Sequence, residues 1–277
     1  MVWSGHLEGP AMAIVPLAAE TLRSPSPCDH LIQAYTDDAF LAETVGEFIA
    51  TGLKVNEGAI IIATPKHLGL FGDSLQALRI DVAAATAGNQ ILLLDAERTL
   101  ERFMVDGRPD RTAFFEVITS ALEHVRRAGY PRLRLYGEMV DLLWASDLDA
   151  TVELEQLWNE VLKDPTLSLL CAYRLDPVER RVQGVLRRVT RCHSHLLPAE
   201  DYEVFEAAVT EAYRDVFGTP SDADALRNLI VKFESGTTMP PAHAALFALQ
   251  DLSRSIASDV GARAAAYYRG RRPRARA

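Results

Sequence analysis

Residues 52–67 read GLKVNEGAIIIATPKH, and this stretch decides the fold. Its centre, Ala59–Ala63, is a continuous apolar run, which is typical of a strand buried on both faces, as in a parallel sheet. A helical pattern precedes the run, and another, Leu68–Leu78, follows it. A strand between two helices is the repeating unit of α/β folds. The stretch therefore predicts one such unit.

The same alternation continues on both sides of this stretch. Apolar runs predict five strands, at His30–Tyr35, Ala59–Ala63, Ile91–Leu94, Leu133–Tyr136 and Leu167–Tyr173. Helical patterns separate them, at Ala83–Ala87, Ala96–Met104, Arg111–Ala128, Glu138–Ala145 and Asp147–Leu162. Strands that alternate with helices imply right-handed crossovers between parallel strands. We therefore expect an α/β fold with a mostly parallel sheet of five or more strands and helices on both faces.

The helix predicted directly after the strand at His30–Tyr35 has recognisable ends. Asp37 or Asp38 can accept hydrogen bonds from its free N–H groups. Its apolar positions include Leu41 and Phe48, and Gly52 lies where a left-handed C-cap is expected.

The chain divides into three predicted parts. Residues 1–27 are proline-rich without a clear period and read as a flexible lead-in that has room for one short strand or helix. Residues 28–218 form the α/β domain, ending in an amphipathic helix over 198–217. Residues 219–277 form a C-terminal helical extension, with helices at Asp224–Glu234 and Pro241–Tyr268. A short basic tail ends the chain at Arg269, Arg271, Arg272, Arg274 and Arg276. We interpret the tail as a solvated end.

Composition limits the class of protein. The chain has 277 residues, of which 48% are hydrophobic, so it can bury a large core, and its net charge of −9 disfavours nonspecific binding to nucleic acid or anionic lipid. No apolar run approaches the roughly 20 residues that cross a bilayer, and no secretory signal is evident. Three cysteines are too few for a disulfide framework. We therefore expect a cytoplasmic protein without membrane or direct nucleic-acid partners.

The loop after the central strand does not have a phosphate-binding sequence. Ligands of open α/β sheets bind beyond the carboxyl ends of the strands. A phosphate loop there needs G-x-x-x-x-G-K-[ST], but residues 63–69 read ATPKHLG, and Pro65 removes a backbone donor. Lys66 can still meet an anion at a helix start, and Asp95 resembles either a metal-holding Walker B carboxylate or a helix N-cap. ATP hydrolysis is not expected, while a nucleotide-binding switch without hydrolysis stays open.

Other residues whose side chains could take part in catalysis or ligand binding have two interpretations each. Glu138 is an acid, base or ligand contact at the sheet edge, or a first-turn glutamate favoured by the helix dipole. Tyr136 and Trp144 bring aromatic surface to the same edge, although Trp144 also fits a helix core stripe. No G-x-S-x-G or H-E-x-x-H motif is present. We therefore predict no catalytic residues and no cofactor.

The cysteines and two nearby histidines allow a further alternative, a soft-metal or redox sensor. Its candidate residues are Cys28, Cys171, Cys192, His193 and His195. Their spacings form neither a C-x₂-C nor an H-x₃-H pair. Buried cysteines and a surface histidine pair are the competing interpretation.

Several short motifs occur together in one order along residues 28–200. They are HLIQAY (30–35), ATPKH (63–67), LLDA (93–96), FMVDG (103–107), YGEMV (136–140), LW (143–144), LEQLWN (154–159) and SLLCAY (168–173). In this order they resemble the MEDS domain, a methanogen/methylotroph sensory domain first recognised in a dichloromethane-responsive repressor. The resemblance implies a RecA/KaiC-like fold with a degenerate phosphate loop. It also implies a sensory role, with small and often apolar molecules as ligands.

The resemblance suggests a sensing pocket. His30, Tyr35, Tyr136 and Glu138 match family motif positions, and together with Lys66, Asp95 and Trp144 they are our candidate ligand-binding residues. After residue 200 there is neither a helix-turn-helix pattern nor a kinase motif. We therefore expect a small-molecule sensor whose output passes through a regulatory protein partner, a homo-oligomer or the C-terminal helices.

Overall fold

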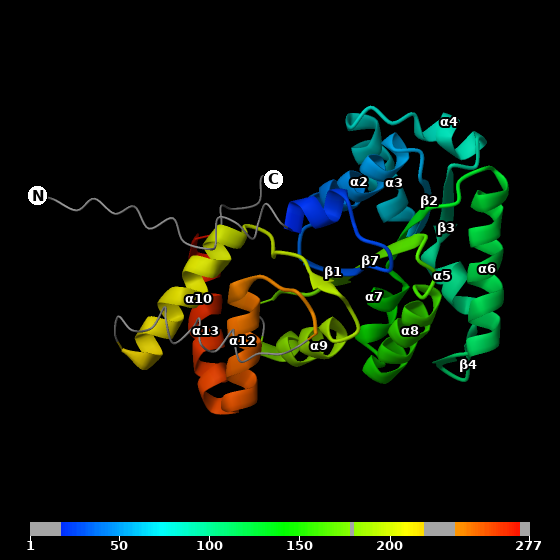
Figure 1. Cartoon of the computed structure of the whole chain (residues 1–277). Helices are drawn as coiled ribbons and strands as arrows, with labels where there is room; N and C mark the ends of the chain where they lie inside the picture. The colour runs from blue at the N-terminus through cyan, green and yellow to red at the C-terminus, as the bar shows by residue number, and fades with distance from the viewer. Residues whose placement is uncertain (1–17, 178–179, 219–235, 272–277) are drawn as a thin grey trace, which may run out of the picture.

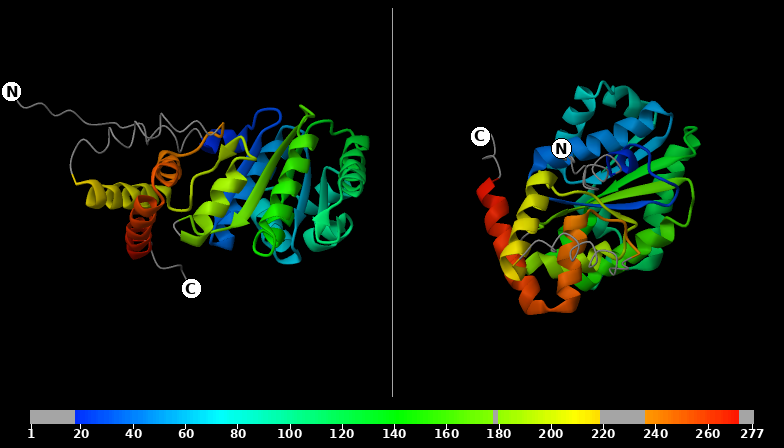
Figure 2. Two further views of the ribbon diagram at one scale, coloured as in Figure 1. Left: turned by 90° about the horizontal axis from the view of Figure 1, so that it is seen from below. Right: turned by 60° about the vertical axis from the view of Figure 1, so that its left-hand side comes forward.

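The computed structural model describes residues 18–177, 180–218 and 236–271. Its main body is a six-stranded sheet with helices on both faces, and a separate group of helices lies beside the sheet (Figures 1 and 2). The strand order is β3-β2-β6-β7-β1-β8, and every neighbouring pair is parallel. The predicted α/β class with a parallel sheet is therefore confirmed.

All five predicted strands are present. They are β1 (His30–Tyr35), β2 (Gly58–Ala63), β3 (Ile91–Asp95), β6 (Leu133–Gly137) and β7 (Leu167–Arg174). The sixth strand, β8 (His195–Leu196), pairs with β1 and was not predicted, because two residues carry no periodic pattern. A small antiparallel hairpin, β4 (Met104–Val105) and β5 (Arg108–Pro109), stands apart from the sheet.

Each face of the sheet is covered by its own set of helices. Alternate residues of a strand point to opposite faces, so Ile32 of β1 packs on one side and Leu31 on the other. The Leu31 side is covered by α2 (Asp38–Lys54), α3 (Pro65–Ala77) and α4 (Val82–Ala87). The Ile32 side is covered by α5 (Ala96–Glu101), α6 (Arg111–Arg127), α7 (Met139–Trp144), α8 (Leu148–Val161) and α9 (Arg180–Thr190).

Helix α2 begins as expected and ends differently. Asp37 is its N-cap and accepts from the N–H groups of Ala39 and Phe40 at 2.8 and 3.0 Å. The expected left-handed cap at Gly52 is wrong: the helix continues to Lys54, and Asn56 takes the positive φ of 64°. Gly52 therefore lies inside the helix, where it meets a spatial requirement.

That requirement comes from Arg134 on β6. A Cβ at Gly52 would lie 2.5 Å from the Arg134 Nε, closer than the two atoms can approach. The Arg134 side chain is buried, and it donates to Glu57 Oε2 and to the Phe48 carbonyl oxygen, both at 2.7 Å. It also donates to the carbonyls of Leu22 and Arg23, in a helical segment over residues 18–23.

The C-terminal helices form their own hydrophobic cluster. They are α10 (Tyr202–Phe217), α12 (Pro241–Leu252) and α13 (Arg254–Arg271), and their contacts centre on Phe205 and Val260. The single helix predicted over Pro241–Tyr268 is wrong, because Ser253 is extended at φ −161° and its hydroxyl accepts from Ile256 N–H at 3.5 Å. Ser253 thus ends one helix and caps the next.

The remaining predictions on this part of the chain have mixed outcomes. Helix α9 was not predicted at all. The helix predicted at Asp224–Glu234 and the tail residues Arg272, Arg274 and Arg276 lie outside the described residues, as do residues 1–17 of the lead-in. Among the helices that the structure describes, none combines the length and apolar character that crossing a membrane requires.

Candidate functional site

Four of the connections at the carboxyl edge of the sheet are very short. Thr36 and Asp37 separate β1 from α2, Thr64 alone separates β2 from α3, and Glu138 alone separates β6 from α7, while α5 follows β3 directly. A phosphate loop needs a longer connection, whose N–H groups surround the phosphates. These four connections are too short to form one, which agrees with the missing glycines.

Glu138 lies at the N-terminus of α3, the kind of position where α/β proteins bind anions. Its Oε1 accepts from the backbone N–H of Thr64. Its Oε2 accepts from the Tyr136 hydroxyl at 3.1 Å and lies 2.6 Å from Nδ1 of His67. Glu138 is only 2% exposed. The chain therefore fills this anion position with its own carboxylate.

A second carboxylate, Asp141 on α7, gathers three donors. The Trp144 indole N–H donates to it at 2.8 Å, the Arg174 backbone N–H at 2.7 Å, and the Tyr35 hydroxyl at 3.3 Å. The Arg174 guanidinium lies 4.9 Å from the centre of the Tyr35 ring and pairs with Asp38. Aromatic, acidic and basic groups from four elements thus meet at this edge.

Burial shifts the proton affinities of several groups here. Burial raises the pKa of Tyr35, and the charge of Asp141 raises it further. Burial also raises the pKa of Tyr136 well above its usual value, with Glu138 adding to the shift. The pKa of Asp141 is raised by burial, although the Arg174 N–H opposes this. Clusters of perturbed groups are a common mark of functional sites.

Four of the candidate ligand-binding residues therefore come together, namely Tyr35, Tyr136, Glu138 and Trp144. Four neighbouring residues, which sequence reasoning missed, contact them or one another: Asp38, His67, Asp141 and Arg174. We call all eight residues the carboxyl-edge network. His67 lies in the ATPKH motif, and Asp141 in the turn after Glu138, so both stood beside noted residues.

The other candidates lie elsewhere. Lys66 is at the rim, with a side chain 69% exposed and Nζ 2.5 Å from Asp38 Oδ2. Asp95 caps α5 by accepting from the Arg98 N–H at 3.0 Å, which is the simpler of its two interpretations. His30 is at the amino end of β1, in a second cluster.

This second cluster lies beneath α8 and α9, on the other face of the sheet from Tyr35. One ligating atom from each of four buried residues, His30, Glu155, Cys171 and His193, lies within 4.8 Å of the other three. The Tyr173 hydroxyl donates to Glu155. Burial raises the pKa of the Cys171 thiol well above its usual value, and burial lowers the pKa of His193 to about 3. We call these four residues the buried cluster.

The buried cluster includes two residues of the predicted metal set, Cys171 and His193, and adds two others. Glu155 was missed, although the sequence carries a signal: it lies beside Leu154 and one turn from Thr151 and Trp158, on the buried stripe of α8. A carboxylate on an apolar stripe needs a partner.

The remaining predicted metal ligands lie outside the buried cluster. Cys192 contributes its carbonyl oxygen, which is 3.1 Å from His30 Nδ1, and burial raises the pKa of its thiol to about 11. His195 contacts Ser194 and Asp29 through Nδ1. Cys28 is exposed in a turn with φ of 67°.

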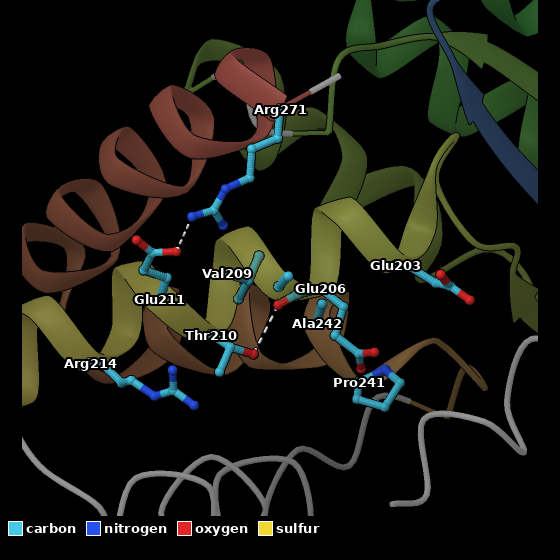
Figure 3. A pocket seen from close by; sticks show the side chains of 10 residues that line it. Glu203, Glu206, Val209, Thr210, Glu211, Arg214, Pro241, Ala242 and Arg271 are labelled. Atoms are coloured by element: carbon cyan, nitrogen blue, oxygen red, sulfur yellow. Dashed lines mark hydrogen bonds and ion pairs between the residues drawn. The ribbon is translucent and has the colours of Figure 1, made fainter. Parts of the chain in front are cut away.

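The described part of the chain also has hollows away from both sites. One, of about 440 Å³, lies along α10 and the start of α12, with Glu206, Glu211 and Arg271 in its lining (Figure 3). Another, of about 330 Å³ and mostly apolar, lies beside β8 at Leu196 and Met239.

Comparison with known families adds an identity to this geometry. Residues 29–194, more than half of the chain, match the family described as MEDS: MEthanogen/methylotroph, DcmR Sensory domain. The chain belongs to the MEDS family. The match covers all strands from β1 to β7 and ends one residue before β8, so both the carboxyl-edge network and the buried cluster lie within the MEDS domain. No curated protein matches the chain.

Proposed function

We propose that this MEDS protein senses a small, uncharged molecule at the carboxyl edge of its sheet and does not transform it. The observation that carries the proposal is the position of Glu138. Its carboxylate occupies the N-terminus of α3, held by Thr64, His67 and Tyr136. A phosphate would have to displace this buried carboxylate against its charge, which is unfavourable. The site therefore favours ligands without phosphate over nucleotides.

The rest of the carboxyl-edge network supports binding rather than catalysis. Both oxygens of Asp141 accept hydrogen bonds from the chain's own groups. The bond from Tyr35 to Asp141 is the longest of the three, at 3.3 Å, and is therefore the easiest for a ligand to replace. Trp144 is half-buried and offers an aromatic wall beside it. A small molecule with an apolar body and a weak polar group suits these surroundings.

The origin and the output of the domain belong to the same proposal. The all-parallel sheet covered on both faces is compatible with descent from a RecA/KaiC-like fold whose phosphate loop was lost. We place the boundary of the sensory unit before α10, because α10 packs with α12 and α13 rather than on the sheet. This helical unit then passes the signal to a regulatory protein or to a second copy of the chain.

Thermal-shift measurements on the full chain test the proposal. The probes are dichloromethane, methanol and toluene, with ATP and Mg²⁺ in parallel. We expect at least one organic probe to raise the unfolding midpoint, because a ligand that binds only the native state stabilises it. Asp141→Asn should abolish the shift, and Asp73→Asn, an exposed change on α3, should retain it. A shift with ATP and Mg²⁺ but with none of the organic probes would overturn the proposal.

A further inference from the structure

The buried cluster contains the donor atoms of a metal site. Its residues come from four different segments: His30 from β1, Cys171 from β7, Glu155 from α8, and His193 from the turn after α9. The side chains of Glu155 and His193 are 0% exposed, and that of His30 is 3% exposed. Imidazole, thiolate and carboxylate are all ligands of zinc in proteins.

The distances within the buried cluster match a tetrahedron. His30 Nε2 lies 3.3 Å from Cys171 Sγ and 3.3 Å from Glu155 Oε2. His193 Nε2 lies 3.4 Å from Glu155 Oε1, and Cys171 Sγ lies 3.8 Å from Glu155 Oε2. Zinc bonds of about 2.0 Å to nitrogen or oxygen and about 2.3 Å to sulfur give tetrahedral edges of roughly 3.3 Å between two nitrogen or oxygen ligands and roughly 3.5 Å between one of these and sulfur. These four separations lie within about 0.3 Å of those edges, with Glu155 Oε2 facing His30 and Cys171 and Oε1 facing His193.

Both imidazole rings direct Nε2 toward this centre. Nδ1 of His193 lies 2.8 Å from the carbonyl oxygen of Val189, and Nδ1 of His30 lies 2.9 Å from Asn159 Oδ1 and 3.1 Å from the carbonyl oxygen of Cys192. A carbonyl oxygen only accepts, so each Nδ1 carries the hydrogen, and each neutral ring has its lone pair on Nε2. Metal-binding histidines typically donate their second N–H to a carbonyl or carboxylate in this way.

Hydrogen bonding within the chain leaves the buried cluster short of donors. Two Nε2 lone pairs and the Glu155 carboxylate face one another, and the Cys171 thiol has a single hydrogen to offer. His193 Nε2 is buried without a hydrogen-bond partner among the described residues. A divalent cation would bind both lone pairs and, with the thiol proton released, would balance one thiolate and one carboxylate.

We propose that His30, Glu155, Cys171 and His193 bind one zinc-class divalent cation in a closed, four-coordinate site. Binding of this cation does not require a ligand at the carboxyl edge. Burial on all sides leaves no open position for a substrate, so the cation is structural and ties β1 and β7 to α8 and the turn after α9. Tyr173, which donates to Glu155, is a positioning residue for that carboxylate.

Metal analysis of the full chain, purified without a histidine tag and reconstituted with Zn²⁺, tests this site. We expect one zinc per chain in the wild type and in Cys192→Ser, which changes a cysteine outside the buried cluster. Cys171→Ser should lose the zinc, and Tyr173→Phe should weaken its affinity by about 10- to 100-fold.

Cobalt gives a second measurement that does not depend on a folded variant. Reconstitution of the wild type with Co²⁺ should produce the visible bands of a tetrahedral site and a thiolate charge-transfer band, which Cys192→Ser should keep. A folded wild-type chain that takes up neither metal would overturn the proposal and leave an imidazolium–carboxylate pair in its place. Zinc retained in folded Cys171→Ser would also overturn it.

Discussion

Acidification should destabilise the C-terminal helical unit through a single buried histidine. His243 on α12 is 2% exposed and lies between the rings of Tyr202 and Phe205, at centroid distances of 6.0 and 4.6 Å. Neither ring nitrogen has a hydrogen-bond partner among the described residues. Burial alone lowers its pKa from 6.5 to about 3. Within the part of the chain that the structure describes, the titratable group stacked on it is the Tyr202 phenol, which donates to Glu206 at 3.4 Å.

The direction and size of the effect follow from this shift. Below pH 6.5 the unfolded chain binds a proton at His243, while the native chain does not until the pH nears 3, so the free energy of unfolding falls as pH falls through this window. Between pH 7 and pH 5 the loss amounts to about 2 kcal/mol. It is RT, about 0.6 kcal/mol, multiplied by the natural logarithm of the factor by which proton binding at His243 favours the unfolded chain more at pH 5 than at pH 7. His243→Leu removes the titrating group and should remove this loss.

Chemical denaturation at pH 7 and pH 5, followed by circular dichroism, measures the difference. The wild type should lose about 2 kcal/mol more than His243→Leu between the two pH values. The exposed His124, which contacts Asn89 at 3.0 Å, provides the control, and His124→Gln should behave as the wild type does. Other buried groups, such as His193, are common to all three chains and cancel in the comparison. An equal loss in the wild type and in His243→Leu would refute the reasoning.

Two substitutions in the α/β unit have predictable effects on stability. Gly52→Ala should destabilise the native state by about 1–3 kcal/mol despite the higher helix propensity of alanine, because the new Cβ would meet the Arg134 side chain. The control is Gly69→Ala, whose Cβ would have nothing within 4 Å. This variant should be neutral or stabilise the native state by up to about 1 kcal/mol. Denaturant midpoints of the two variants check this, and equal shifts would contradict it. Glu138→Ala should cost about 3 kcal/mol or more, because it removes the acceptor of three buried donors, and the exposed Glu101→Ala should stay within about 0.5 kcal/mol of the wild type by the same measurement. A Glu138→Ala chain as stable as the wild type would show that these bonds contribute little.

The sheet was predictable because its strands are encoded locally. The run Ala59–Ala63 is apolar and buried along its whole length, which is typical of a strand in a covered parallel sheet. Helix starts were predictable for the same reason, since Asp37 and Asp95 each lie within three residues of the N–H groups that they cap. The short strand β8 lacked a local signal, because its two residues form a strand only through their pairing with β1.

The sites were only partly predictable, because their contacts join distant parts of the chain. His30 and Glu155 are 125 residues apart in sequence, and no spacing rule connects them. Sequence reasoning placed Cys171 and His193 in one set and His30 in another. The pairing of β1 with β7 brings His30 close to Cys171, and the turn after α9 adds His193. Gly52 shows the same limit, because its role depends on Arg134, which lies on strand β6, far from α2 in the sequence.

The two sites share the strands that hold them. Tyr173 donates to Glu155 on one face of β7, and the next residue, Arg174, donates its N–H to Asp141 at the carboxyl edge. Strand β1 likewise begins at His30 and ends at Tyr35. A slip of one residue in either strand would turn both sets of side chains to the wrong faces. A cation that fixes the pairing of β1 with β7 would therefore also hold the carboxyl-edge network in register. If Asp141→Asn abolishes the ligand-induced shift of the unfolding midpoint while the zinc content is unchanged, the carboxyl-edge network is the ligand-binding site and the buried cluster has a structural role.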